Sequence, residues 1–327
     1  MSAKALEPNG PQKGGGRVDA VDFARGAALI GMAFFHLSWD LADYRLVSPM
    51  LPFSPPMRLL SHSVASAFLA LVGVSLALAH RDNVNLPAFW RRLAIVAGAA
   101  ALVSFASFVF APGQVIWFGI LHCIAAASLL ALPLVKAPAA ASLAAGAAAI
   151  ALPFFVHSSR FDPPGLLWLG LGEVEPNTVD WRPLLPWAGV VLVGLGLARL
   201  PGALQRLTSA SRWRAKAAPN RFLCFAGRHS LAIYLVHQPI LIGLVAAVSA
   251  SGLLATFPPP KPDFSGFLAA CQQSCVARGR PAEDCESACQ CVADAIERSG
   301  EADRLGQLDR EREAEMKRMA DACMGRQ

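Results

Sequence analysis

Residues 17–40 read RVDAVDFARGAALIGMAFFHLSWD, and this stretch decides the class of protein. Within it, residues 23–39 are apolar enough to enter a membrane, yet they include Arg25 and His36 and are flanked by Asp22 and Asp40. An ionisable group at mid-bilayer costs about 2.5 kcal/mol or more, so such groups usually have a function. His36 and Asp40 are four residues apart and share a helix face, where the carboxylate can orient the imidazole. The structural alternative is that His36 merely caps a helix or lies near the membrane interface.

The composition of the whole chain also indicates a membrane protein. Of its 327 residues, 54% are hydrophobic and 16% are charged, whereas about a quarter of the residues in soluble domains are charged. Seven segments are long and apolar enough, or nearly so, to cross about 30 Å of hydrocarbon. They lie at residues 22–39, 60–79, 90–110, 115–134, 139–156, 184–200 and 230–249. We therefore expect an all-α fold, a polytopic transmembrane helix bundle of about seven spans.

The loops between these segments predict the orientation. Counted with the head through Arg17, the loops on the side that receives the amino terminus carry 14 Lys and Arg, against 5 in the loops and the start of the tail on the other side. Basic loops are typically cytoplasmic. We therefore expect a multi-pass protein of the bacterial inner membrane, with a cytoplasmic amino terminus and a periplasmic carboxyl terminus. The basic excess then reflects topology and contact with membrane lipid, and predicts no nucleic-acid partner.

Composition shifts divide the chain into four parts. Residues 1–16 are polar and contain Gly and Pro, which predicts a disordered cytoplasmic head. Residues 17–250 form the transmembrane domain, and residues 251–263 form a Pro-rich linker. Residues 264–327 are charged and rich in cysteine, which predicts a helical tail of a different kind.

Six of the eight cysteines lie in this tail: Cys271, Cys275, Cys285, Cys289, Cys291 and Cys323. The first four form two pairs with four-residue spacing, so each pair shares a helix face. Two helices folded back at Gly279–Pro281 would bring the pairs together in a disulfide-linked helical hairpin, leaving the last two cysteines to bond each other. Six cysteines allow many connectivities, so this one is a preference. A zinc site is the weaker alternative, because no histidine follows His237.

Further histidines lie within the predicted spans. His122 is in the fourth, and His237 is in the seventh, on one face with Tyr234 and Gln238. For any single histidine, a structural hydrogen bond is the commoner role. Several histidines that meet from different spans would instead indicate a site or a pathway. The sequence contains no phosphate-binding loop, dinucleotide fingerprint, nucleophile elbow or zinc-protease motif.

One combination of motifs resembles a known family. Asp22-x-x-Arg25-Gly26, followed by Met32-x-x-x-His36-x-x-x-Asp40, resembles the bacterial branch of the heparan-α-glucosaminide N-acetyltransferase catalytic-domain family. Further matching motifs lie at residues 68–75, 118–122, 185–187 and 227–239. The resemblance covers about residues 17–250. The first motif alone also resembles wider membrane acyltransferases, and the cysteine-rich tail is no part of the resemblance.

The resemblance implies that the domain transfers an acyl group, typically acetyl, across a membrane to a sugar or glycan-type acceptor. Its donor would be acetyl-CoA or another acyl-CoA, with no metal. Arg25 and Arg228 would then meet the phosphates of the donor, because guanidinium pairs well with phosphate oxygens. The chain is shorter than the eukaryotic enzyme, which leaves the acceptor open, and a homo-oligomer is compatible with the sequence.

For catalysis, His36 oriented by Asp40 would act as general base or would carry the acyl group transiently. His122 and His237 are the other candidates. The alternative function is a transporter or proton-coupled carrier with a histidine-lined cavity. A third interpretation makes the tail the active part and the spans its anchor. Acyl-CoA binding favours the enzyme, and solute uptake without acyl turnover favours the transporter.

Overall fold

The computed structural model describes residues 18–209, 215–254, 256–257, 264–299, 318 and 322–323. The expected disordered head lies outside these residues. The chain divides into two compact units, Met1–Phe257 and Pro258–Gln327.

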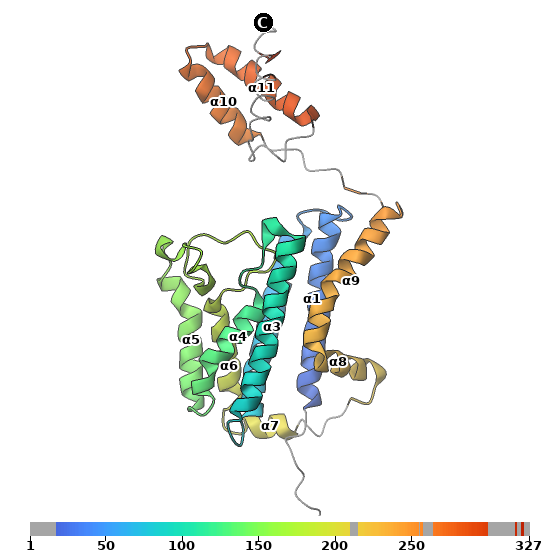
Figure 1. Cartoon of the computed structure of the whole chain (residues 1–327), viewed down its shortest axis with the longest axis vertical. Coiled ribbons are helices and arrows are strands. Elements are labelled where there is room, and N and C mark those ends of the chain that lie inside the picture. Colours follow the sequence, from blue (N-terminus) through green and yellow to red (C-terminus); the bar gives the residue numbers. More distant parts are fainter. Residues whose placement is uncertain are drawn as a thin grey trace, which may run out of the picture. The chain divides into compact units, whose positions relative to one another are not determined.

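The first unit is a bundle of helices (Figure 1). Four of them are long and apolar enough to cross a membrane: α1 (Asp19–Asp43), α2 (Pro55–Ala79), α3 (Leu86–Phe110) and α9 (Ser230–Ala250). Three shorter apolar helices occupy the other predicted positions: α4 (Ile120–Ala131), α5 (Ala139–Phe155) and α6 (Leu184–Ala198). The all-α transmembrane bundle is therefore confirmed, while the number of spans stays a prediction.

Two predicted boundaries differ from the structure. The fourth apolar segment was expected from residue 115, but α4 begins only at Ile120, because Gly119 before it is extended. The basic stretch between the sixth and seventh apolar segments was expected to be a loop, yet it contains α7 (Ala203–Ser209) and α8 (Ala218–Arg228). Helix α8 is amphipathic, and its buried face packs on α1.

Helices α2 and α6 approach each other closely at glycines. A Cβ atom at Gly73 would lie 2.0 Å from the carbonyl oxygen of Val191, and one at Gly194 would lie 2.3 Å from that of Ala70. Small residues allow such backbone contact, which is the usual way in which helices associate in lipid. The pair forms the main apolar core together with α4.

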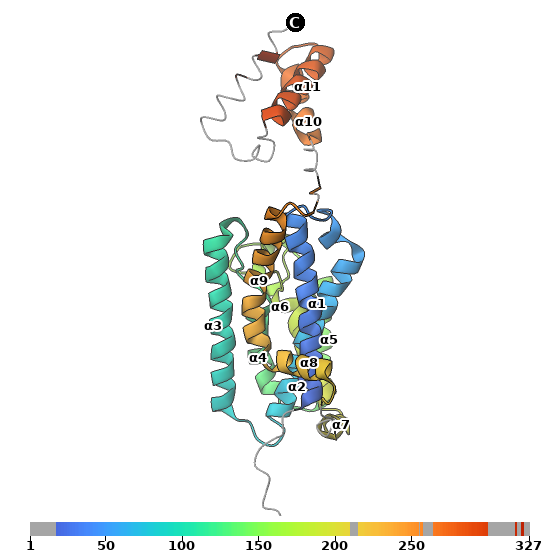
Figure 2. The same ribbon diagram turned by 90° about the vertical axis from the view of Figure 1, so that its right-hand side faces the viewer.

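Helix α8 crosses the beginning of α1 and fixes it (Figure 2). A Cβ at Gly26 would lie 2.1 Å from a backbone oxygen of α8, and one at Gly227 would lie 1.7 Å from a backbone oxygen of α1. Arg228 also places its guanidinium 2.8 Å from a carboxylate oxygen of Asp19 and 3.3 Å from one of Asp22. Glycine contacts and ion pairs together position the polar start of α1.

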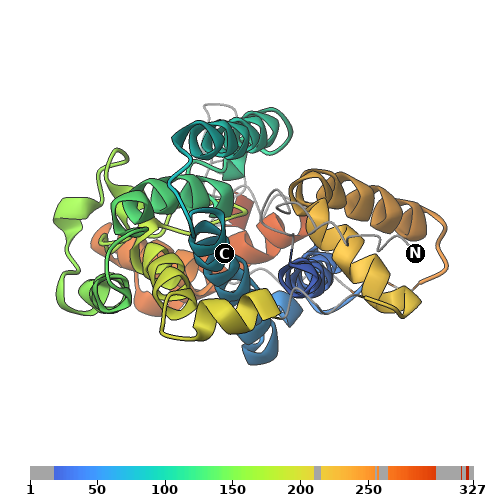
Figure 3. The ribbon, with the colours of Figure 1, turned by 90° about the horizontal axis from the view of Figure 1, so that it is seen from below.

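Helix α3 lies at the periphery of the bundle (Figures 2 and 3). Asn85 caps the amino-terminal end of α3, because its Oδ1 accepts a hydrogen bond from the N–H of Ala88 at 3.0 Å. Large apolar side chains are exposed along it outside the cavity and suit contact with lipid hydrocarbon: Leu102, Phe105, Phe108 and Val109.

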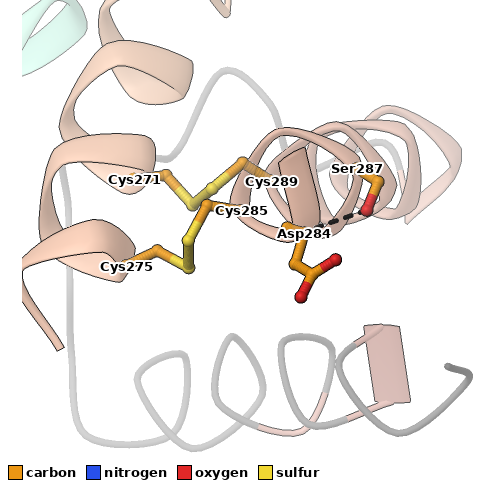
Figure 4. Close-up of a disulfide and its surroundings, with 6 residues drawn as sticks. All are labelled: Cys271, Cys275, Asp284, Cys285, Ser287 and Cys289. Carbon is orange, nitrogen blue, oxygen red and sulfur yellow. Dashed lines mark hydrogen bonds between the residues drawn. A yellow bond between two sulfur atoms is a disulfide. The ribbon is translucent and has the colours of Figure 1, made fainter. Parts of the chain in front are cut away.

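The second unit contains two antiparallel helices, α10 (Ser265–Ala277) and α11 (Ala282–Ser299), which turn at Gly279 with φ of 84°. Its disulfides join Cys271 to Cys289, Cys275 to Cys285, and Cys291 to Cys323 (Figure 4 shows the first two). The disulfide-linked helical hairpin is thus confirmed. A small apolar cluster around Val292 and Ile296 is its only core among the described residues.

Candidate functional site

A cavity of about 660 Å³ lies within the bundle, lined by α1, α2, α3, α4, the α8–α9 junction and the segment that precedes α6. Arg25 and His36, both on α1, line it. They are eleven positions apart on the helix, which corresponds to about 16 Å along the axis. The cavity therefore has two ends with different chemistry.

Four arginines define its basic end, at the beginnings of α1 and α3 and the junction of α8 with α9: Arg25, Arg91, Arg92 and Arg228. Arg25 donates a hydrogen bond to the hydroxyl of Ser75 and lies 3.5 Å from a carboxylate oxygen of Asp22. Arg228 holds the carboxylates of Asp19 and Asp22. Guanidinium groups outnumber carboxylates here, so this end suits an anion.

The opposite, histidine end is defined by His36, Trp39, Ser61, Asp180, Trp181 and Arg182. The ring centres of His36 and His237 are 4.9 Å apart, and the two rings meet edge to face. No hydrogen bond links either ring nitrogen of His36 to another described residue. His237 places Nδ1 2.6 Å from the carbonyl oxygen of Tyr234, while its buried Nε2 has no partner in the described part of the chain. Two imidazoles from different membrane helices, α1 and α9, thus meet, which is the arrangement that the sequence analysis associated with a site or a pathway.

The expected hydrogen bond between Asp40 and His36 does not form. The carboxylate of Asp40 instead accepts a hydrogen bond from Nε2 of Gln238 at 2.7 Å. The spacing of four residues places Asp40 and His36 on the face of α1 that meets α9, but the hydrogen-bond partner of Asp40 comes from α9 and is not His36. In this structure Asp40 therefore fixes α9 against α1, close to the two histidines.

The segment before α6 contributes two charged residues that sequence reasoning missed. Asp180 accepts a hydrogen bond at 2.8 Å from the first backbone N–H of α4 and lies 3.5 Å from the hydroxyl of Tyr234. Arg182 donates to the hydroxyl of Ser61 at 2.5 Å, and its guanidinium lies 5.2 Å from the ring centre of Trp187. The available signal was a pair of opposite charges directly before an apolar run.

The sequence also matches the model of a known family. The model of one family, described as Heparan-alpha-glucosaminide N-acetyltransferase, catalytic, matches residues 17–239. The chain belongs to this family. The match covers well over half of the chain and includes both ends of the cavity, whereas the cysteine-rich tail lies beyond it. No curated protein and no solved structure matches the chain.

Membership of the heparan-alpha-glucosaminide N-acetyltransferase catalytic family supports a membrane acetyltransferase-type function. Members generally use acetyl-CoA as the donor. Of the predicted site residues, Arg25, Arg228 and His36 line the cavity, and His237 contacts His36. Within the described residues, no three His, Cys, Asp or Glu side chains are grouped as metal ligands.

His122 does not line the cavity, although its neighbour Leu121 does and both fall within the family match. Its Nδ1 accepts a hydrogen bond from the N–H of Gly119 at 3.2 Å, and its Nε2 lies 3.3 Å from the hydroxyl of Ser104. Both ring nitrogens are therefore engaged in holding the beginning of α4. This geometry favours the structural alternative for His122, and its catalytic role stays a prediction.

Proposed function

We propose that this protein transfers an acyl group, in the first instance acetyl, from an acyl-CoA at the basic end to a sugar or glycan-type acceptor at the histidine end. The observation that carries the proposal is a cavity that is lined by the guanidinium groups at one end and by the imidazole of His36 at the other. The bias of Lys and Arg supports a cytoplasmic basic end. The acceptor would then enter from the periplasmic side.

The two ends match the two parts of a CoA thioester. Its phosphates are anionic and suit guanidinium groups, whereas its thioester lies at the far end of a long pantetheine arm. The walls between the ends are mostly apolar and can hold that arm: Val64, Phe68, Val72, Ile95 and Ile124. Arg25 and Arg228 are the two residues that the sequence analysis assigned to these phosphates, and both line the basic end of the cavity.

His36 would carry the chemistry in one of two ways. As general base, it removes a proton from the acceptor O–H or N–H while that oxygen or nitrogen attacks the thioester carbon. The C–S bond breaks, and the imidazolium returns the proton to the departing thiolate. As carrier, its ring nitrogen attacks the thioester carbon, the thiolate leaves, and the acceptor then removes the acyl group from the imidazole. The free ring nitrogens of His36 permit both routes.

The histidine end has features that suit a sugar. Trp39 and Trp181 offer flat aromatic faces, and Asp180 and Arg182 supply fixed polar groups beside them. A binding site of this kind, apolar with a few oriented polar groups, is typical for small ligands. These residues would position the acceptor hydroxyl or amine toward His36.

Substitution of His36 tests the proposal. His36→Ala should lower acetyl transfer from labelled acetyl-CoA to an amino-sugar acceptor by roughly 10²–10⁴-fold, the usual effect of losing a general base. His237→Ala and His122→Ala are measured beside it. His62→Ala is the matched control, because His62 is on a membrane helix but outside the cavity lining.

The assignment moves to His237 or His122 if His36→Ala keeps its turnover and one of those variants loses it. If all three variants stay active, the histidine mechanism is wrong. Acetyl label that stays on His36 when no acceptor is present would distinguish the carrier from the base. Solute uptake into vesicles without acyl turnover would favour a transporter instead.

A further inference from the structure

We propose that Arg91 and Arg92 on α3 bind the phosphate groups of the acyl donor, and that Arg228 instead fastens α8 to α1. The inference rests on the proposed function, because it assigns residues to the donor end of the same cavity. No family motif recognised in the sequence includes either of these two arginines.

The ion pairs at the basic end separate the four arginines into two kinds. Arg25 and Arg228 share the carboxylate of Asp22, and Arg228 also holds Asp19. Arg91 and Arg92 form no ion pair with any described acidic residue, although both line the cavity. Two adjacent cations without a carboxylate repel each other and the nearby Arg25, and a bound anion would remove that repulsion.

The face that α3 turns toward the cavity is well defined. Its lining residues recur at the spacing of a single helix face: Ala88, Arg91, Arg92, Ile95 and Val96. The start of this helix is fixed by the Asn85 cap and by Phe89, which is buried. Arg91 and Arg92 are therefore held on a rigid element, which suits recognition of a fixed ligand.

The beginning of α9 adds to the anion-binding character of this end. Ser230, the first residue of α9, lines the cavity, and no side chain caps that helix terminus. The free N–H groups of a helix start carry partial positive charge and favour phosphate. Arg91 and Arg92 lie across the same cavity end, so a phosphate there would meet positive charge from α3 and α9.

Lipid headgroups also carry phosphate, and basic residues near a membrane surface attract them. Because Arg91 and Arg92 line the cavity, the acyl donor is favoured over a lipid headgroup as the source of the phosphate. The two sources are separated by measuring CoA and pantetheine binding to the full-length protein in vesicles of phosphatidylcholine, with and without phosphatidylglycerol. Pantetheine lacks the nucleotide and its phosphates, so its binding reports a folded cavity.

The double variant Arg91→Gln, Arg92→Gln should weaken CoA binding by about 10-fold to 100-fold, as expected for lost charge-assisted hydrogen bonds. Its pantetheine affinity should not change, and the result should be the same in both lipid mixtures. Arg81→Gln is the matched control, because Arg81 pairs with Asp82 and does not line the cavity. That variant should bind CoA as the wild type does.

Unchanged CoA affinity in the double variant overturns the assignment and leaves the proposed function intact. A loss that appears only with phosphatidylglycerol also overturns it, since the pair would then bind lipid. If the wild type binds CoA no more tightly than pantetheine, the donor in the proposed function is wrong and this inference is wrong with it.

Discussion

In the bundle, α2 and α6 touch backbone to backbone at Gly73 and Gly194, whereas in the tail α10 and α11 are joined by two disulfides and contain few buried apolar side chains. We attribute this difference in how the helices are held together to their surroundings, which are lipid for the bundle and water for the tail. Lipid gives helices no hydrophobic reason to associate, so close packing of small residues must do it. A short unit in water buries too little apolar surface to be stable, and covalent links compensate.

The largest effect is expected from reducing the disulfides. Losing native disulfides from a small domain typically costs about 2–5 kcal/mol, so the tail should unfold in reductant. The bundle should keep its structure, because its two cysteines, Cys123 and Cys224, are free and buried. Hydrogen exchange of the full-length protein, with and without reductant, measures both regions at once. Protection of α10 and α11 that survives reduction would show that the tail core suffices.

A smaller effect is expected from Gly73→Ala. The added methyl group would meet the backbone of α6, and overpacking of this kind costs about 1–3 kcal/mol. The temperature at which the bundle unfolds in detergent should therefore decrease, while the hydrogen-exchange protection of α10 and α11 should not change. Gly98→Ala on α3 is the matched control, because nothing lies within 4 Å of its Cβ. Equal stability of the two variants would contradict glycine-mediated packing in the bundle.

The smallest effect is expected from lowering the pH, which should reduce the stability of the bundle. Burial lowers the pKa of His80, which follows α2, from 6.5, and the positive charges of Lys136 and Arg92 lower it further. The folded bundle therefore keeps His80 neutral where the unfolded chain takes up a proton. Its contribution to stability is complete above pH 6.5 and decreases as the pH falls below that value.

Unfolding of the bundle measured between pH 7.5 and 5.5 should show this decrease, and His80→Gln should reduce it. The tail has no histidine, so its unfolding should not follow the same curve. An identical pH dependence in His80→Gln and the wild type would show that other groups are responsible.

The helices and the tail hairpin were predictable because their signals are local: apolar run length in one case and cysteine spacing in the other. Helix α8 was missed because its basic residues were counted as loop, although its apolar residues recur on one face. Arg25 and His36 were recognisable as polar groups in an apolar run. Their surroundings were not, since no pattern in α1 shows that Gln238 of α9 will bind Asp40.

The first and last membrane helices of this domain lie side by side (Figure 1), and this has a consequence for synthesis. Asp40 and Gln238 are 198 positions apart in the chain. At about 5–20 residues per second, roughly 10–40 s pass between the emergence of α1 and that of α9. During that interval Asp40 and His36 lack their α9 neighbours. The contact between α1 and α9 therefore forms last. A nascent chain stopped before α9 contains Arg91 and Arg92, the donor ligands proposed above, but lacks the helix that contacts His36 and Asp40.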